Sequence, residues 1–311
     1  MSNTILQGPV GIVGFGTIGQ RWAAGFSHAG LEVRCFDPDA TRWTQFEENR
    51  PGLMTDLDAL RGDATAAGKI SFSTDMGEAL AGVVFVQENG PEKIELKQLL
   101  LAEIERHIGD DVIVASSSSA LMVTQMQALC RRPQRIVLGH PFNPAHLMPL
   151  VEIVGGEKTE AAALAAARAF YEAIGKKPVV LNREITGHLA LRLMGAMWRE
   201  AIAMARDGVA SVEDIDRAFV YGPGPKWTLQ GAFISNHLNA EGIESFMVKY
   251  GPTYQAIWDD LLDARLDAPT IEAVSKSLRG AIGDRTDDDL RAERDSGLVE
   301  ILRSVARHGA L

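Results

Sequence analysis

Four polar side chains lie in one apolar stretch, GHPFNPAHLMPLVEIV at residues 139–154. They are His140, Asn143, His146 and Glu152. A buried polar group without a partner costs about 1–3 kcal/mol, so we expect these groups to be paired or to take part in chemistry. A histidine held by a carboxylate is a good general base near neutral pH. The spacing across a turn predicts either a catalytic dyad, in which Glu152 orients His140, or a structural pair in the core. His146 is interpreted as a surface histidine or one that supports the site from behind.

A run of serines, VIVASSSSAL at residues 112–121, follows another strand-like segment. Ligands of parallel sheets bind beyond the carboxyl ends of the strands. Serine hydroxyls at such an end could donate hydrogen bonds to a substrate oxygen. They could equally cap the next helix, because serine is a favoured helix N-cap.

A glycine motif, VGIVGFGTIG at residues 10–19, contains Gly14, Gly16 and Gly19 in the GxGxxG spacing. Such a motif between a strand and a helix is typical of a dinucleotide cradle, because the glycines permit a tight turn and close approach to a pyrophosphate. Thr17 and Ile18 then lie at the start of the helix, whose partial positive charge faces the phosphates.

An aspartate follows this motif at the expected distance. Asp37 lies 18 residues after Gly19, at the end of the strand-like segment LEVRCFD. A carboxylate there accepts hydrogen bonds from ribose hydroxyls and repels a 2′-phosphate, which favours NAD over NADP. The alternatives are a flavin, which uses a related cradle, and a glycine-rich turn beside a surface aspartate.

The elements that position these residues alternate in the first half of the chain. Strand-like segments are separated by helix-like ones, among them PEKIELKQLLLAEIERH at residues 91–107. This alternation predicts a parallel, doubly wound α/β sheet of the Rossmann type. The strand-like segments are PVGIVGF, LEVRCFD, GVVFVQE, DVIVASS, RIVLGH, LVEIVGG and PVVLN.

After about residue 183 the pattern becomes helical, which predicts a Rossmann domain over residues 1–185 and an all-helical domain over residues 186–311. The segment YGPGPKW at residues 221–227 should separate two helices. Ser211 with Asp214, and Thr286 with Asp289, are spaced as capping boxes. One apolar helix face is expected from Leu189, Leu193, Met197 and Ala201.

The composition is that of an ordinary globular protein of 311 residues, with 46% hydrophobic and 23% charged residues. The net charge of −10 disfavours nucleic acid or an anionic membrane as the main partner. Cys35 and Cys130 are expected to be free thiols, and no metal-ligand spacing is present. A signal peptide and a long apolar segment are both missing from the sequence, so we expect a cytoplasmic protein.

Together, the glycine motif, the SSSSAL run and the HPFNP…LVEIV run resemble the 3-hydroxyacyl-CoA dehydrogenase family over nearly the whole chain. The resemblance implies an NAD-dependent enzyme that forms a homodimer through its helical domain. It implies that His140 is the catalytic base and Glu152 its partner, and that Ser119 and Asn143 hold the substrate oxygen. By the same resemblance, Glu92 lies near the nicotinamide, and we assign Ser117 to the cofactor site as well.

One part of the sequence departs from this family. The family usually has Gly-Phe-x-x-Asn-Arg at the start of its second domain, whereas this chain has GHLALR at residues 187–192. Leu191 replaces the asparagine that usually contacts substrate. His188 replaces the phenylalanine, and it is interpreted as a partly exposed hinge residue or as a substitute polar contact. The nature or pose of the substrate is therefore open.

The charge distribution bears on which branch of the family the chain resembles. A CoA ester needs basic groups for its phosphates. Residues 41–70, where the family carries such groups, hold four basic and five acidic residues. MWREAI and DGVASVEDID resemble L-carnitine 3-dehydrogenases, and HLNAEG resembles λ-crystallin and L-gulonate 3-dehydrogenases. We therefore expect a small 3-hydroxy acid as substrate. The alternatives are a short-chain CoA ester and a crystallin-like NAD-binding protein without significant turnover.

Overall fold

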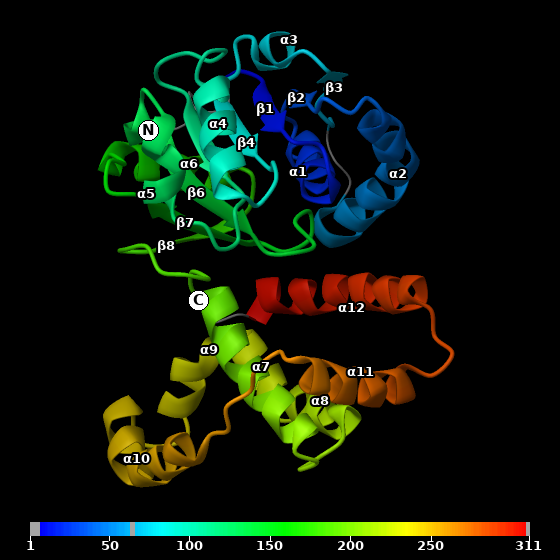
Figure 1. The fold of residues 1–311 in the computed structure, drawn as a ribbon, viewed down its shortest axis with the longest axis vertical. Helices are drawn as coiled ribbons and strands as arrows, with labels where there is room; N and C mark the ends of the chain where they lie inside the picture. Colours follow the sequence, from blue (N-terminus) through cyan, green and yellow to red (C-terminus); the bar gives the residue numbers. More distant parts are fainter. Residues whose placement is uncertain (1–6, 63–65, 309–311) are drawn as a thin grey trace. The chain divides into compact units, whose positions relative to one another are not determined.

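The computed structural model describes residues 7–62 and 66–308 of the chain (Figure 1). The chain divides into two compact units, Met1–Ala190 and Leu191–Leu311. The first unit is an α/β unit built around one sheet, and the second is helical. The predicted α/β class followed by a helical region is confirmed.

The sheet of the first unit has eight strands in the order β3-β2-β1-β4-β5-β6-β7-β8. The pairs from β3 through β6 are parallel, as predicted. β7 is antiparallel to β6, so β7 and β8 run opposite to the other strands, and the prediction of a wholly parallel sheet is wrong there. The reason is that β7 follows β6 through a turn and not through the long crossover that a parallel neighbour requires. The strands are β1 Val10–Val13, β2 Val33–Phe36, β3 Ile70–Ser73, β4 Phe85–Glu88, β5 Ile113–Ser116, β6 Ile136–Pro141, β7 Leu150–Gly155 and β8 Lys177–Val180.

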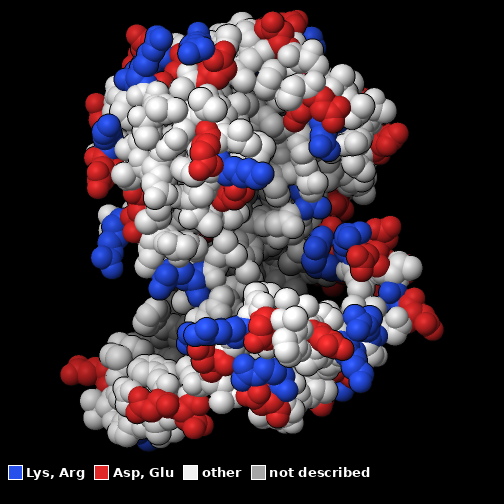
Figure 2. Space-filling view, viewed as in Figure 1, with Lys and Arg blue, Asp and Glu red and all other residues white. Residues whose placement is uncertain are grey.

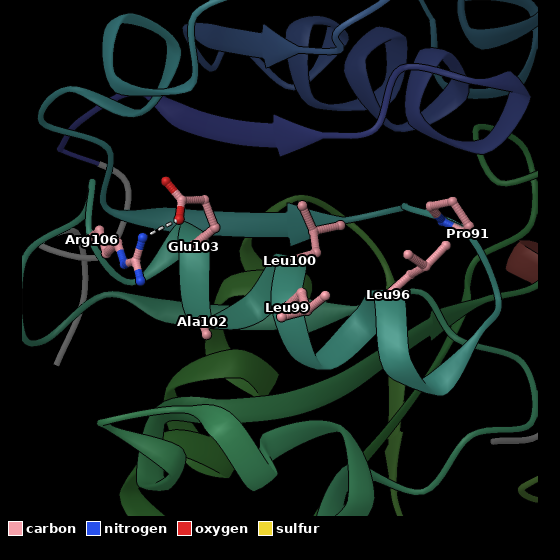
Figure 3. Close-up of a pocket in the computed structure, with 7 residues that line it drawn as sticks. All are labelled: Pro91, Leu96, Leu99, Leu100, Ala102, Glu103 and Arg106. Carbon is pink, nitrogen blue, oxygen red and sulfur yellow. Dashed lines mark hydrogen bonds and ion pairs between the residues drawn. The ribbon is translucent and has the colours of Figure 1, made fainter.

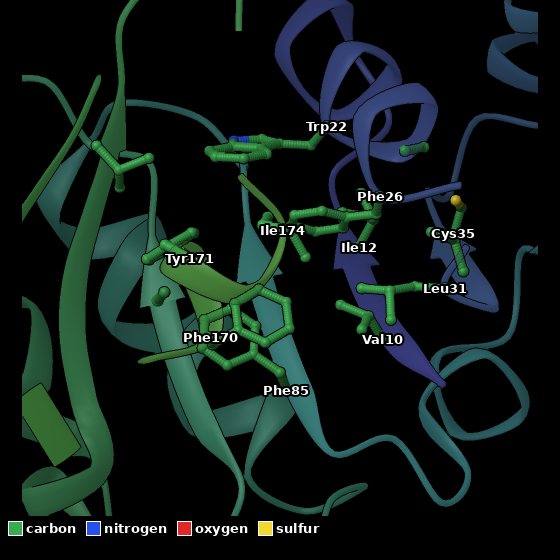
Figure 4. Close-up of a cluster of buried hydrophobic side chains, with 14 of the residues drawn as sticks. Val10, Ile12, Trp22, Phe26, Leu31, Cys35, Phe85, Phe170, Tyr171 and Ile174 are labelled. Atoms are coloured by element: carbon green, nitrogen blue, oxygen red, sulfur yellow. The ribbon is translucent and has the colours of Figure 1, made fainter. Parts of the chain in front are cut away.

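Helices cover both faces of this sheet. Alternate residues of a strand point to opposite faces, and accordingly Ile12 and Val13 of β1 belong to two different hydrophobic clusters. On one face, the cluster drawn in Figure 4 includes Trp22 and Phe26 from α1 and Phe170 from α6. The other cluster takes its helical residues from α3, α4 and α5. The helices are α1 Thr17–His28, α2 Thr41–Arg61, α3 Met76–Leu80, α4 Ile94–Ile104, α5 Val123–Met126 and α6 Ala161–Ala173, with short 3-10 turns at Gln127–Leu129 and Pro133–Arg135.

The strand order reverses between β1 and β4, which pair in parallel with Val13 beside Glu88. In open α/β sheets, ligands bind in the crevice that such a reversal creates at the carboxyl ends of the strands. The glycine motif follows β1, the serine run follows β5, and His140 lies near the end of β6. Because β1, β4, β5 and β6 are parallel, these groups all lie toward the same edge of the sheet.

The second unit consists of helices joined by short connections. α8 packs against α9 and α11, and α9 also contacts α10 and α12. The predicted break in YGPGPKW is confirmed, since α8 ends at Tyr221 and α9 begins at Pro223. The predicted capping box at Thr286 is confirmed by reciprocal hydrogen bonds with Asp289. At Ser211 the hydroxyl caps the helix by accepting from the Asp214 N–H, and it donates to the Asp214 side chain. The helices are α7 Ala190–Arg206, α8 Val212–Tyr221, α9 Pro223–His237, α10 Ile243–Asp260, α11 Ala268–Ile282 and α12 Asp287–His308.

The predicted apolar face of α7 is exposed along much of its length. Leu193 is 75% exposed, and Met197 is 42% exposed. A helix that presents large apolar side chains to water is typical of an interaction surface. The described residues of the second unit therefore do not bury this face in the way that the periodic pattern suggests.

Charged side chains of both signs are mixed on the face of the molecule shown in Figure 2, where no broad basic area is visible. None of the helices within residues 7–62 and 66–308 is long and apolar enough to cross a membrane. The cytoplasmic location stays a prediction. Cys35 is buried and Cys130 is partly buried, and both are free thiols, as predicted.

Candidate active site

The histidine and glutamate of the apolar stretch face each other across two strands. His140 in β6 is directly opposite Glu152 in β7 in the antiparallel register. Its Nδ1 atom lies 2.8 Å from Glu152 Oε2, and the two residues are 5% and 1% exposed. An ionised carboxylate can only accept, so His140 Nδ1 carries the hydrogen in this pair. His140 Nε2 is then the nitrogen that could take a proton from a substrate.

The second carboxylate oxygen of Glu152 is fixed by the backbone that leads into α7. Oε1 accepts hydrogen bonds from the backbone N–H groups of Leu189 and Ala190, each at 2.8 Å. Burial alone would raise the pKa of Glu152, but the hydrogen bonds from His140, Ala190 and Leu189 together lower it below its ordinary value. Glu152 is therefore a buried carboxylate that stays ionised and holds the imidazole in one orientation.

The serine run after β5 forms a turn closed by Glu92. Glu92 Oε1 accepts from Ser118 Oγ at 2.7 Å and from the backbone N–H groups of Ser119 and Ala120. Ser119 is exposed. Ser117, by contrast, is held in an internal network, where its hydroxyl donates to Asn89 Oδ1 and accepts from the side chain of Gln87. Glu92 thus shapes the turn that presents Ser119, which is a role that the sequence did not suggest.

The turn after β6 carries Asn143 and His146. Asn143 Oδ1 accepts a hydrogen bond from the Arg21 guanidinium of α1, which links this turn to the helix that follows the glycine motif. His146 is 1% exposed, and its Nε2 lies 3.2 Å from Asp56 Oδ2 of α2. The interpretation of His146 as a surface residue is wrong. It is enclosed beneath the turn, where it connects the turn to α2.

The glycine motif has the geometry of a phosphate cradle. Gly14 adopts φ +86°, and a Cβ added there would lie 2.7 Å from the backbone of Asn89. A Cβ on Gly19 would lie 2.1 Å from the Gly14 carbonyl oxygen. α1 therefore packs so closely against the glycine loop that position 19 has no room for a side chain. Gly16, however, has no atom within 4 Å of an added Cβ. Gly16 is also the N-cap of α1 and has no side chain to satisfy the first N–H groups, which leaves an open, positively polarised space.

Asp37 follows β2 and lies beside this cradle. Its Oδ2 accepts from the backbone N–H of Phe15 at 2.7 Å, and its Oδ1 accepts from that of Asp39 at 3.0 Å. The carboxylate is therefore held next to the loop that would carry the pyrophosphate, at the distance along the chain expected for a ribose contact. The residues present fit a dinucleotide.

His188 lies beside His140 and is buried, so its interpretation as a partly exposed hinge residue is wrong. It is 1% exposed, and the centroid of its ring lies 5.3 Å from that of His140. Its Nε2 lies 3.4 Å from the carbonyl oxygen of Ser118, and its backbone adopts φ +50°. Burial lowers the pKa of His188, and the electrostatic effect of the neighbouring His140 lowers it further. Its imidazole is therefore kept neutral.

Sequence reasoning missed a buried ion pair at the end of β4. Lys97 Nζ lies 2.8 Å from Glu88 Oε1, and the side chains are 1% and 0% exposed. Glu88 Oε2 also accepts from the Ser116 hydroxyl at 2.6 Å. The signal in the sequence was an acidic residue, Glu88, at the end of the apolar segment GVVFVQE. A lysine, Lys97, follows in the first turn of the next helix. This pair ties the end of β4 to α4 and β5 beneath the site.

A groove on the outer side of α4, shown in Figure 3, has a volume of about 520 Å³. Its lining is mainly apolar and includes Leu96, Leu99 and Leu100. Its two charged residues, Glu103 and Arg106, form an ion pair with each other, with 2.7 Å between Glu103 Oε2 and Arg106 Nη1. Its carboxylate, Glu103, is already paired with Arg106 and His107, so we place the candidate site at the His140–Glu152 pair instead. Among the described residues, no three His, Cys, Asp or Glu side chains gather in a way that could hold a metal ion.

Comparison with known families and structures identifies relatives over nearly the full chain. Residues 9–185 match the NAD binding domain of 3-hydroxyacyl-CoA dehydrogenase, and residues 187–265 match its C-terminal domain. L-carnitine dehydrogenase of Streptomyces coelicolor is 39% identical over 305 residues, which cover 96% of this chain and 95% of that protein. L-carnitine dehydrogenase of Bacillus cereus is 35% identical, over 96% of this chain and 93% of that protein.

Solved structures that are similar to this chain are also dehydrogenases. The NAD+-dependent 5-formyl-3-hydroxy-2-methylpyridine 4-carboxylic acid 5-dehydrogenase has a TM-score of 0.85 and 30% identity, covering 96% of this chain and 98% of its own. The (S)-3-hydroxybutyryl-CoA dehydrogenase of Ralstonia eutropha has a TM-score of 0.63 and 28% identity, covering 78% and 87%. With its dinucleotide cradle and these relatives, the chain belongs to the 3-hydroxyacyl-CoA dehydrogenase family and is an NAD-dependent dehydrogenase that acts on a CH–OH group.

Proposed function

We propose that this chain oxidises the 3-hydroxyl of a small 3-hydroxy acid to the 3-keto acid, with His140 as general base and Glu152 as its orienting partner. The observation that carries the proposal is the hydrogen bond of 2.8 Å between His140 Nδ1 and a buried, ionised Glu152. A carbinol loses its hydroxyl proton as it is oxidised, and a neutral imidazole nitrogen within reach accepts that proton.

The residues around the dyad have roles that follow from their positions. His140 Nε2 would take the hydroxyl proton, while Glu152 stabilises the imidazolium that forms. Ser119, presented by the turn that Glu92 closes, and Asn143, in the turn after β6, would hold the reacting oxygen. The chemistry that bound NAD supplies is acceptance of a hydride from the carbinol carbon.

Cofactor binding is assigned to the glycine loop and its surroundings. The residues proposed to hold NAD are Gly14, Gly16, Thr17, Ile18, Gly19, Asp37, Glu92 and Ser117. The loop and the start of α1 would bind the pyrophosphate, and Asp37 would accept from the ribose hydroxyls. Glu92 and Ser117 would act mainly by fixing the backbone near the nicotinamide, since both are already engaged with neighbouring groups.

The charges of α2 favour a small acid over a CoA ester. α2 contains three basic and four acidic residues. Its basic groups are engaged within the protein, since Arg42 pairs with Asp39, Arg50 with Glu47, and Arg61 donates to the Ile174 carbonyl. Binding the phosphates of CoA would require breaking these contacts. The names of the relatives make L-carnitine the first small 3-hydroxy acid to test.

The proposal is tested by following NADH formation with L-carnitine, L-gulonate and (S)-3-hydroxybutyryl-CoA under identical conditions. Turnover of at least one free acid that exceeds turnover of the CoA ester is expected. Turnover of the CoA ester alone would establish the alternative of a short-chain 3-hydroxyacyl-CoA dehydrogenase. NAD binding without oxidation of any of these compounds would support a crystallin-like protein instead.

We further propose that residues 186–311 contribute to substrate binding and form a homodimer. The large exposed apolar side chains of the helical unit support this, because a monomer rarely leaves so many uncovered. Examples are Leu193 at 75% exposed, Phe233 at 83% and Val248 at 76%. Light scattering coupled to size-exclusion chromatography should give twice the chain mass, and a monomer at micromolar concentration would contradict the dimer.

A further inference from the structure

Asn89 follows β4 directly, at the point where the strand order of the sheet reverses. Its backbone N–H donates to the Val13 carbonyl oxygen at 2.7 Å, which ties it to the end of β1. A Cβ added to Gly14 would lie 2.7 Å from the Asn89 backbone, so the residue borders the glycine loop. Ligands of open α/β sheets bind at such a reversal, and Asn89 is partly exposed there. The residue is therefore placed beside the loop that would carry the cofactor.

The side chain of Gln87, two residues earlier in β4, has only one possible orientation. Gln87 is 0% exposed, and its Nε2 atom lies 3.1 Å from the Gly139 carbonyl oxygen. A carbonyl oxygen can only accept, so the NH2 group of Gln87 must face it. Gln87 Oε1 then accepts from the Tyr171 hydroxyl at 2.5 Å. Burial raises the pKa of Tyr171 well above its ordinary value, so this hydroxyl keeps the proton that it donates.

The strands around this amide leave room for it. β5 pairs with β6 only as far as Ser116 beside Leu138, so the Gly139 carbonyl lies past the end of that ladder, where Gln87 donates to it. A Cβ added to Gly139 would lie 2.0 Å from the Tyr171 hydroxyl oxygen. A glycine immediately before His140 is therefore what allows α6 to bring a tyrosine hydroxyl against the amide.

The orientation of Gln87 determines where the hydroxyl hydrogen of Ser117 points. Ser117 Oγ accepts from Gln87 Nε2 at 2.8 Å and from the Trp22 indole Nε1 at 3.3 Å. An indole nitrogen can only donate, and a hydroxyl oxygen has two acceptor positions. Both positions are then occupied, so the hydroxyl hydrogen is directed to Asn89 Oδ1, which lies 2.7 Å away.

The amide of Asn89 is oriented in turn, and one of its hydrogens is left over. Oδ1 accepts from Ser117, and Nδ2 donates to the carbonyl oxygen of Gln87 at 3.0 Å. An amide NH2 group carries two hydrogens. Within residues 7–62 and 66–308, the second hydrogen of Asn89 makes no hydrogen bond. A partly exposed donor in the crevice is thus held in a fixed direction by groups that are themselves fully used.

We propose that Asn89 is a cofactor-binding residue, and that Gln87 is the positioning residue that directs its second N–H toward bound NAD. Direction passes from the Tyr171 hydroxyl through Gln87 and Ser117 to Asn89. A donor suits this cofactor, because its pyrophosphate, ribose and carboxamide groups all contain acceptor oxygens. The inference rests on the cofactor that the family uses and not on the substrate of the proposed function.

The experiment measures the Kd of NADH by fluorescence titration in the wild type, Asn89→Ala, Gln87→Met and the double variant. Asn89→Ala should raise the Kd by about tenfold, the typical effect of one lost hydrogen bond. Gln87→Met keeps the side-chain length but no longer donates to Ser117, so the Asn89 amide loses its fixed direction and the Kd should rise by about three- to tenfold. Because both changes remove the same contact, the double variant should stay near tenfold and not approach about a hundredfold.

A second route through the network tests the same link with a smaller change. Ser117→Ala removes only the connection between Gln87 and Asn89. It should raise the Kd of NADH in the wild type and add nothing in the Asn89→Ala background, even if Gln87→Met folds poorly. Gln98→Met is the matched control, since this glutamine of α4 donates to the Gln125 carbonyl oxygen outside the network. Its Kd should equal that of the wild type, and thermal melting reports the stability of every variant.

Three outcomes would overturn the inference. An Asn89→Ala protein that binds NADH as tightly as the wild type would show that Asn89 does not contact the cofactor. Losses that multiply in the double variant would show that Gln87 and Asn89 act independently. Variants of Gln87 and Ser117 that melt earlier but keep the wild-type Kd would leave the network with a structural role alone. None of these measurements involves a substrate, so their failure is distinct from a failure of the proposed function.

Discussion

Replacement of Glu152 by glutamine should block catalysis by placing the proton of His140 on the wrong nitrogen. Glu152 now accepts three hydrogen bonds, two at Oε1 from Leu189 and Ala190 and one at Oε2 from His140. A glutamine has one oxygen and one NH2 group. If its oxygen faces the two backbone donors, its NH2 group faces His140 Nδ1. That nitrogen must then accept, and the proton moves to Nε2, which can no longer act as a base.

The opposite amide orientation is the less stable one. It would direct the NH2 group at the two backbone N–H groups and leave both donors unpaired, at a cost of about 1–3 kcal/mol each. The blocked tautomer should therefore dominate. The loss in kcat should be about 10³- to 10⁴-fold, or about 4–5.5 kcal/mol in activation free energy, similar to other enzymes in which the carboxylate beside a catalytic histidine becomes an amide.

The assay is steady-state oxidation of the best 3-hydroxy acid, combined with NADH titration and 15N NMR of the histidine side chains. The variant should bind NADH within about threefold of the wild type, because Glu152 is not among the proposed cofactor contacts, while NMR should report the Nε2–H tautomer of His140. Glu103→Gln, a change at an exposed surface glutamate, is the control. A Glu152→Gln enzyme that keeps more than a tenth of wild-type kcat would refute the tautomer argument.

Three further predictions concern stability and cofactor binding. Lys97→Met leaves the Glu88 carboxylate buried without its cation, which should lower the free energy of unfolding by about 3–5 kcal/mol in a denaturant titration. Gly16→Ala should melt like the wild type but lose NADH affinity by at least tenfold, whereas Gly19→Ala, whose Cβ would meet a loop carbonyl at 2.1 Å, should lose both affinity and stability. His188 has a lowered pKa in the folded chain, so the unfolded chain binds more protons below pH about 6.5. The wild type should therefore lose more melting temperature than His188→Asn between pH 7.5 and 5.5, and equal losses would contradict a buried neutral imidazole.

The sequence identified the residues whose environment is local. The glycine spacing, Asp37 and the dyad follow from patterns within a strand–turn–helix or a strand–turn–strand unit, where chain connectivity alone brings the groups together. The His140–Glu152 pairing in particular needs only an antiparallel return of β7. The sequence did not predict that β7 runs antiparallel to β6. Alternating apolar segments do not reveal whether a connection crosses over the sheet or turns back directly.

Residues whose partners are distant in the chain could not be predicted. His146 contacts Asp56, 90 residues away, and His188 contacts Ser118, 70 residues away. Both histidines lie in segments rich in glycine, proline or polar residues, which favours an exposed interpretation. Their burial depends on how α2 and the serine turn pack beside them, and a single sequence does not contain that information.

The segment of residues 187–190 helps to hold Glu152 in place, and this constrains which residue position 188 can contain. Its backbone donates to Glu152 from Leu189 and Ala190, and its side chain at His188 borders His140. The positive φ of His188 sets the direction of the two N–H groups that follow it. A residue that resists a positive φ, such as a β-branched one, would move those donors and loosen their hold on Glu152. Valine at this position should therefore reduce turnover of every substrate, whereas asparagine, which tolerates a positive φ, should preserve most of the turnover.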